Sequence, residues 1–148
     1  MKRFSFRLEK VLRYRKYLET NARIKLINTI NEYNITENSV KMIAAKRKEI
    51  SAECSKEKRN GMDVARYRLY YHFNQKLNDD QEAGVLALKK TEATVHLHRT
   101  LLKKESVKKK TLETLKEIQS SRYREISEKE EQKELDETVI IRNKRISL

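Results

Sequence analysis

The chain has 148 residues, of which 39% are charged and 37% apolar, and its formal net charge is +13. Because apolar residues make up about 45–50% of a typical globular domain, this composition excludes a thick hydrophobic core. Two glycines and no proline leave few of the residues that most often break helices. The excess of Lys and Arg favours an acidic partner, which means nucleic acid, an anionic membrane or an acidic protein surface.

One cysteine excludes an internal disulfide and fits a reducing compartment. No apolar run approaches the roughly 18 residues of a membrane span, and no signal-peptide core follows the first cations. We therefore expect a single cytoplasmic domain over residues 1–148.

The first expected element is a helix over residues 5–59, with Ser5 as its N-cap. Its apolar residues recur at gaps of three, four or seven, which is the spacing of one helix face and not the alternation of a strand. A narrow seam of this length cannot be buried by its own helix, so a second helix of similar length is needed. The seam consists of Phe4, Leu8, Val11, Leu18, Ala22, Leu26, Ile30, Tyr33, Val40, Ile43, Ile50 and Cys54.

The pair Asn60-Gly61 is the clearest turn signal in the sequence, since both residues tolerate a positive φ. Asp63 can then cap a short helix over residues 63–77. Aromatic residues are concentrated in this helix, where they either fill the end of the hairpin or form an exposed docking patch. They are Tyr67, Tyr70, Tyr71 and Phe73, with Leu77 on the same face.

A third helix is expected over residues 80–142, because Asp79 and Glu82 have the spacing of a capping box. A second, shorter stripe beside its seam (Leu101, Leu115 and Ile118) either widens the core or meets another protein. The seam itself continues through Val85, Leu88, Val95, Leu102, Leu112, Tyr123 and Ile126.

Charge then predicts how the helices pair. Residues 1–16 hold seven cations and only Glu9 as an acid, whereas residues 125–137 hold seven acids and two lysines. An antiparallel hairpin lays these two stretches side by side, and exposed ion pairs of about 0.3–0.5 kcal/mol each would select the register. The predicted fold is all-α, a long antiparallel two-stranded coiled coil (helical hairpin) with a short helix near the turn.

No catalytic, metal or cofactor constellation is found, so we expect neither an enzyme nor a cofactor. There is no Gly-rich phosphate loop. His96 and His98 point about 200° apart on a helix and cannot chelate one metal. Cys54 lies on the seam spacing, which favours a buried thiol.

Three classes of function remain. The first is an interaction protein whose two ends bind different partners, and the second is a nucleic-acid binder. The third is a membrane-surface helix over residues 2–16. The seam favours the first class, because a surface helix does not need a matched partner helix later in the chain. The nucleic-acid hypothesis rests on the tyrosines and on Lys103, Lys104, Lys108, Lys109 and Lys110, without any recognition motif, and nucleic acid is therefore not expected as a partner.

The opening of the chain has the pattern Phe-x-Phe-Arg-Leu-x-x-Val-Leu-x-Tyr-Arg over residues 4–15, followed by Glu19. This pattern resembles the N-terminus of the FliJ family, the small coiled-coil component of the bacterial flagellar type III export apparatus. The ending, Leu135-Asp136-Glu137 and then residues 139–142, resembles that family too. The resemblance extends over the chain in length and in helix order.

The resemblance implies a stalk that enters the ring of the flagellar export ATPase, promotes ring formation and activity, and contacts the cytoplasmic domain of the large export-gate protein. It also implies a link to export chaperones and a position at the inner-membrane face of the flagellar basal body. Injectisome stalk proteins of the same architecture remain an alternative. On this chain the implied ATPase-ring contacts are Phe4, Phe6, Arg7, Leu8, Lys10, Val11, Leu12, Arg13, Tyr14, Arg15, Ile140, Ile141 and Arg142, and the implied gate contacts are Ile43, Ile50, Phe73 and Leu77.

Overall fold

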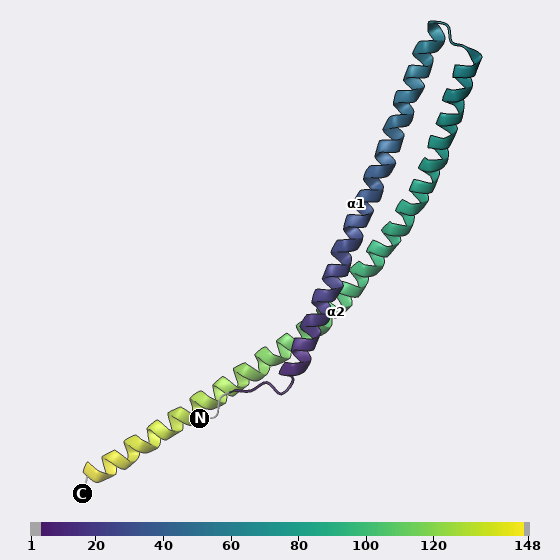
Figure 1. The fold of residues 1–148 in the computed structure, drawn as a ribbon. Helices are drawn as coiled ribbons and strands as arrows, with labels where there is room; N and C mark the ends of the chain where they lie inside the picture. Colours follow the sequence, from purple (N-terminus) through teal and green to yellow (C-terminus); the bar gives the residue numbers. More distant parts are fainter. Residues whose placement is uncertain (1–3, 147–148) are drawn as a thin grey trace. The chain divides into compact units, whose positions relative to one another are not determined.

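The computed structural model describes the backbone of residues 4–146 and the side chains of residues 4–142. Two helices account for nearly all of this part: α1 spans Glu9–Arg59 and α2 spans Val64–Ile146 (Figure 1). The contacts described below show that α1 and α2 pack against each other in antiparallel orientation. The expected all-α helical hairpin is therefore confirmed.

The turn between the helices forms where the sequence predicts it. Gly61 has a φ of 86°, a conformation that glycine adopts without steric cost. The amides of Asn60 and Gly61 donate to the carbonyls of Glu57 (3.1 Å) and Lys58 (3.4 Å), which satisfies the end of α1. Asp63 directly precedes α2, and its carbonyl accepts the first helical hydrogen bond from the Tyr67 amide at 3.0 Å.

The expectation of a separate short helix over residues 63–77 is wrong, because α2 passes through residues 78–80 without a break. Asn78 donates from Nδ2 to Glu82 Oε1 at 2.9 Å, a pair one helical turn apart that supports a continuing helix. Asn and Asp cost only a few tenths of a kcal/mol in a helix interior, and packing of neighbouring seam residues outweighs that cost. The start of α1 also differs, since the helix begins at Glu9 and not near Ser5.

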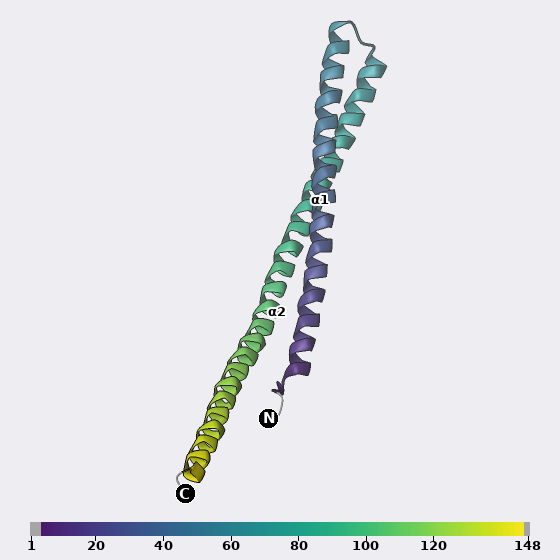
Figure 2. The ribbon, with the colours of Figure 1, turned by 90° about the vertical axis from the view of Figure 1, so that its left-hand side faces the viewer.

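The chain forms two compact units, one with Met1–Thr20 and Lys104–Leu148, the other with Asn21–Lys103. In the second unit, Thr29 meets His98, Val40 meets Gly84 and Arg47 meets Gln81, so the partner number falls as the α1 number rises. This is the antiparallel order, and both views show α1 and the teal part of α2 side by side below the turn (Figures 1 and 2).

The seam of this second unit follows the expected positions closely. Ile50 and Val95 are buried, and most other predicted members are half-buried. Thr29 is also buried, with only 5% of its surface exposed, although it is polar. Its hydroxyl donates to the Lys25 carbonyl (2.8 Å) and contacts His98 Nδ1 (2.8 Å), so its polar atom is satisfied.

The first unit has a more polar seam than predicted. Leu12 is buried and Val11 is 43% exposed, so the buried face is turned by one residue from the predicted one. Glu19 is buried too, and its carboxylate accepts from Ser106 Oγ at 2.6 Å and pairs with Lys109 Nζ at 2.8 Å. A search for apolar spacing alone misses such a position.

The acidic stretch over residues 125–137 was expected beside residues 1–16, of which 1–3 lie outside the described residues, and the described residues 4–16 pair with an earlier part of α2. Glu9 pairs with Lys116 (2.8 Å) and Lys16 with Glu113 (3.7 Å), while the ring of Phe4 lies 5.7 Å from that of Tyr123. This register puts the start of the described chain opposite Tyr123. It follows the buried Leu12 and Glu19 layers and not the net charge, because exposed ion pairs contribute too little to shift it.

Candidate functional site

The first candidate surface is the end of the first unit, where the pairing of α1 with α2 stops and α2 continues. Beyond Tyr123, α2 continues as one unbroken helix from Arg124 to Ile146, about 35 Å at 1.5 Å per residue. Figure 2 shows this segment running past the start of α1. We call residues 124–146 the α2 extension, and every residue from 128 to 142 in it is exposed.

The α2 extension changes character along its length. Residues 125–137 are dominated by acids, on a protein that is otherwise strongly basic. Val139, Ile140 and Ile141 follow, and each of these three exposes more than half of its surface. Three consecutive residues span about 200° around a helix, so the apolar surface here is broad and not a narrow stripe. Large exposed aliphatic residues grouped in this way are typical of a protein-binding surface.

The predicted N-terminal contact residues fall into two groups. Phe6 and Leu12 are buried within the first unit, so they hold the end together and are not available as contacts. Arg15 is half-buried and pairs with Glu105 at 3.5 Å. The exposed members are Arg7, Leu8, Lys10, Val11, Arg13 and Tyr14, and Phe4 is half-buried.

The structure does not place Ile140, Ile141 and Arg142 beside this N-terminal group. Ile140 lies 17 positions beyond Tyr123 on an unbroken helix, about 25 Å farther along it. Sequence reasoning could not detect this offset, because the expected lengths of the two long helices matched while their register was not known. The two predicted sets of contact residues therefore do not form one tip. The α2 extension protrudes beyond the region near Tyr123 where α1 and α2 pair, and we call the start of that paired region the two-helix shoulder.

Several charged side chains of the first unit are paired with an opposite charge within that unit. The carboxyl group of Glu9 has a lowered pKa, first because Lys116 donates a hydrogen bond to it. The pKa of Glu105 is lowered chiefly by its hydrogen bond from Lys108. Lys108 and Lys109, from the lysine cluster noted in the sequence, thus pair with carboxylates, which weakens the case for that cluster as a phosphate-binding surface.

The second candidate surface is the turn end of the second unit. Arg66 grips Glu57 across the turn through Nε (2.8 Å) and Nη2 (3.0 Å), and the Tyr70 hydroxyl donates to the same carboxylate at 3.1 Å. Burial, followed by this contact with Glu57, raises the pKa of Tyr70. These bonds fix the first turns of α2 against the last turns of α1.

An apolar hollow of about 760 Å³ lies beside this clamp. Of the predicted gate contacts, Ile50 and Phe73 line it, whereas Ile43 and Leu77 are half-buried seam residues that do not. Leu69 also lines the hollow and is 70% exposed, the largest aliphatic exposure there. Its spacing of four from Phe73 was the signal that could have added it to the predicted set.

The aromatic cluster is partly buried at the end of the hairpin and partly exposed. Tyr70 is half-buried against α1. Tyr67, Tyr71 and Phe73 are each more than 40% exposed, and Lys58 lies 4.5 Å above the ring of Tyr67. The cluster therefore both closes the turn end and presents rings to solvent.

Neither helix has a stretch long and apolar enough to cross a membrane within the residues searched. The described side chains include no group of three or more His, Cys, Asp or Glu that could hold a metal ion.

The FliJ family model, described as the flagellar FliJ protein, matches residues 4–145. The chain belongs to the FliJ family. It is thus a component of the flagellar export apparatus, and the flagellar assignment is preferred to the injectisome alternative. Neither the comparison with curated proteins nor that with solved structures found a match.

Proposed function

We propose that this FliJ-family chain is a non-enzymatic stalk that binds the hexameric flagellar export ATPase, promotes its assembly and activity, and couples it to the cytoplasmic domain of the large export-gate protein. Export chaperones are a further partner class. In this proposal the protein acts at the cytoplasmic side of the inner membrane, held there through its partners. The observation that carries the proposal is the α2 extension.

The extension has the dimensions that entry into a ring requires. A single helix with side chains is about 10–12 Å across, the narrowest stiff element that a chain can form. The α2 extension carries the exposed Val139, Ile140 and Ile141, which no described side chain of the chain buries. A two-helix shoulder begins at Tyr123, where the paired width would limit how far the extension enters.

Charge adds orientation to this contact. Arg7, Lys10 and Arg13 are exposed at the shoulder, and the acidic part of the extension lies beyond them. Rings that carry acidic loops at the mouth and basic ones deeper inside would match this order. Such rim charges act mainly on association rate and orientation, and they weaken as salt rises.

The gate contact is proposed for the apolar hollow at the turn end. Phe73 and Leu69 are its exposed members, and Ile50 forms its floor. Ile43 and Leu77 lie farther along the seam and would support these side chains more than they touch a partner. Truncation of the exposed pair should therefore weaken gate binding more than truncation of the seam pair at equal helicity.

The test is stimulation of the cognate export ATPase by the full chain. Arg13→Glu should reduce stimulation, because Arg13 is exposed at the shoulder. Arg15 is a poorer choice, since its loss also breaks the pair with Glu105. Arg68→Glu, an equally exposed change in the second unit, is the matched control. Equal stimulation by wild type and Arg13→Glu at low salt would count against the charge contact, and no stimulation by any form would reject the proposal.

A further inference from the structure

On the other side of the seam from the apolar hollow, the second unit has a polar groove that contains neither Leu69 nor Phe73, although Ile50 and Tyr70 border both. One part, of about 530 Å³, is lined by Arg47, Lys48, Ser51 and Asn74 among others, and includes no acidic residue. A second part continues it past Lys58 and Tyr67, and the two share Ser51, Ser55 and Asn74. We call the whole the Arg47 groove.

The walls of the Arg47 groove have the spacing of a helix-binding site. Its α1 wall is Ala44, Lys48, Ser51 and Ser55, at gaps of four, three and four, and its α2 wall includes Tyr67, Asn74 and Gln81, at gaps of seven. Residues at these gaps form continuous stripes along their helices. Two parallel stripes bound the kind of channel in which the third helix of a three-helix bundle lies.

The α1 wall is also built of small side chains where a partner would approach. Ser51, Ala52 and Ser55 are all exposed. Large side chains at these positions would fill the channel between the helices, as Ile50 and Tyr70 fill the seam. The small ones let another backbone come close.

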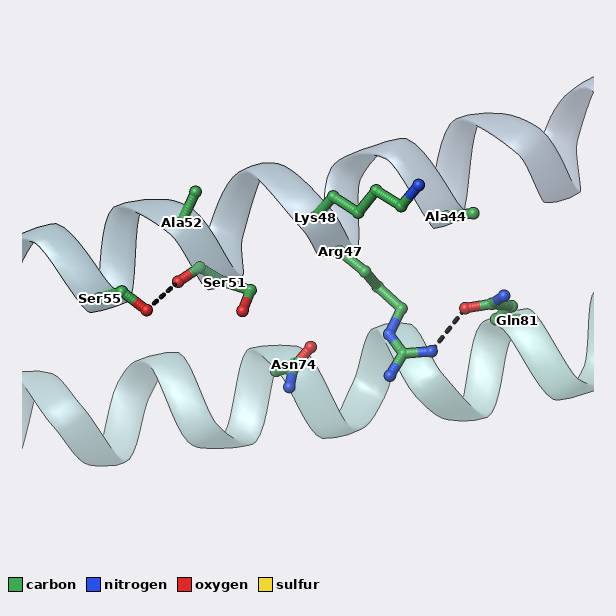
Figure 3. A pocket seen from close by; sticks show the side chains of 8 residues that line it. All are labelled: Ala44, Arg47, Lys48, Ser51, Ala52, Ser55, Asn74 and Gln81. Carbon is green, nitrogen blue, oxygen red and sulfur yellow. Dashed lines mark hydrogen bonds between the residues drawn. The ribbon is translucent and has the colours of Figure 1, made fainter.

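The charge of the groove is uncompensated. Arg47 is half-buried, its Nη1 donates to Gln81 Oε1 at 2.6 Å, and its Nε is buried with no hydrogen-bond partner. Figure 3 shows the guanidinium reaching from α1 to α2, with Gln81 on one side and Asn74 on the other. A buried cationic N–H without an acceptor is costly, and a carboxylate is the acceptor that matches it best. Lys48 and Lys58 add two more cations along the groove.

We propose that the Arg47 groove is a docking site for an acidic helix of a partner protein, with carboxylates at gaps of three and four that meet Arg47, Lys48 and Lys58. The occupant follows from charge complementarity, since the lining holds cations and no acid, and from the heptad spacing of both walls. The Arg47 guanidinium lies in the lining of the groove and is bonded there only to the neutral Gln81 among the described residues, and the serines allow close backbone approach. This site is separate from the gate contact on Leu69 and Phe73.

The probe is a synthetic helical peptide of about 20 residues with glutamates on one face at gaps of three and four, added to the full chain. Saturable shifts of the Arg47 Nε–Hε resonance and of the Ser51 amide are expected. Each exposed pair contributes about twofold in affinity, so Arg47→Ala, Lys48→Ala and Lys58→Ala combined should weaken binding about tenfold. Lys48→Glu alone should weaken it too, and this exposed change leaves the seam packing in place.

Two controls make the result specific. Arg68→Ala removes an exposed cation outside the groove and should change nothing, and Phe73→Ser should leave peptide binding intact while testing the gate contact separately. A peptide of the same composition with glutamates spread around the helix should bind at least tenfold more weakly. Equal binding of both peptides, or tighter binding of a single-stranded oligonucleotide at the same residues, overturns the proposal. Self-association of the chain that Lys48→Glu abolishes would assign the groove to a second copy and overturn it as well.

Discussion

Gly84 on α2 lies directly against Val40 on α1, so close that a Cβ added to the glycine would be 2.9 Å from Val40 Cγ2. Real Cβ atoms essentially never lie this close to another heavy atom. The two helices can therefore approach this closely at Gly84 only because glycine has no side chain. This contact fixes the distance between α1 and α2 in the second unit.

Gly84→Ala should lower the stability of the second unit by about 1 kcal/mol. Overpacking costs about 1–3 kcal/mol, whereas Ala in place of Gly in a helix interior gains about 1 kcal/mol. Val40 cannot turn away easily, because a valine in a helix has one strongly preferred rotamer. Urea unfolding followed by circular dichroism measures the change.

The control for this prediction is the same change in a Val40→Ala background. There the clash is gone, so Gly84→Ala should stabilise by about 1 kcal/mol relative to Val40→Ala alone. A change of the same sign in both backgrounds would contradict the close contact.

Glu19 anchors the seam of the first unit by accepting from Ser106 and pairing with Lys109. Glu19→Ala should destabilise that unit by about 1–3 kcal/mol, since it leaves polar partners without their acceptor. The triple variant Glu19→Leu, Ser106→Ala and Lys109→Leu should be neutral or stabilising, because it removes the polar groups together. Thermal unfolding of the two variants distinguishes them, and equal losses in both would show that Glu19 contributes packing and not polar pairing.

The Glu9–Lys116 pair predicts a pH effect with a definite sign. The folded-state pKa of Glu9 is lowered from its ordinary value of 4.5. A carboxyl group of this kind stabilises the fold fully above the ordinary pKa and loses that contribution as the pH falls through the lowered folded value. Glu9→Gln should therefore lower stability near neutral pH, where the ionised pair is lost, match the wild type in acid below the lowered pKa, and so flatten the acid side of the stability profile. An unchanged acid profile would show that the pair is broken in solution.

The α2 extension should contribute to partner binding and not to folding. Ile140→Ser with Ile141→Ser should leave helix content and unfolding of the paired region unchanged, because both side chains are more than half exposed. Stimulation of the export ATPase should fall about tenfold or more. Burial of each isoleucine at an interface contributes about 1–2 kcal/mol to binding, and serine removes that contribution. Titration of the ATPase with each form measures the change.

The matched control is Ile24→Ser with Ile27→Ser, since these two isoleucines are each 50% exposed but belong to the second unit. That pair should stimulate like the wild type. Equal loss in both variants would point to a general effect of surface hydrophobicity.

The sequence by itself determined that the chain is helical, that it turns at Asn60-Gly61, and which face of α1 from Ala22 to Cys54 is shielded. These features depend on local propensity and on periodicity, both of which can be read from one chain. Asn78, Asp79 and Asp80 were misread as a boundary for a related reason. Cap residues favour helix ends but do not enforce them when packing on both sides continues.

Only the tertiary structure decided the register. Layers such as Glu19 with Ser106 and Gly84 against Val40 fix it, and neither layer stands out as an apolar position. With Phe4 opposite Tyr123, the acidic residues 128–137 lie past the described basic residues 4–16 and are all exposed. The Arg47 groove likewise depends on register, because its two walls come from different helices whose facing residues, from Lys58 with Tyr67 to Ala44 with Gln81, are brought together by packing. Local preference sets which segments are helices, but the relative slide of two helices is a property of the contacts between them.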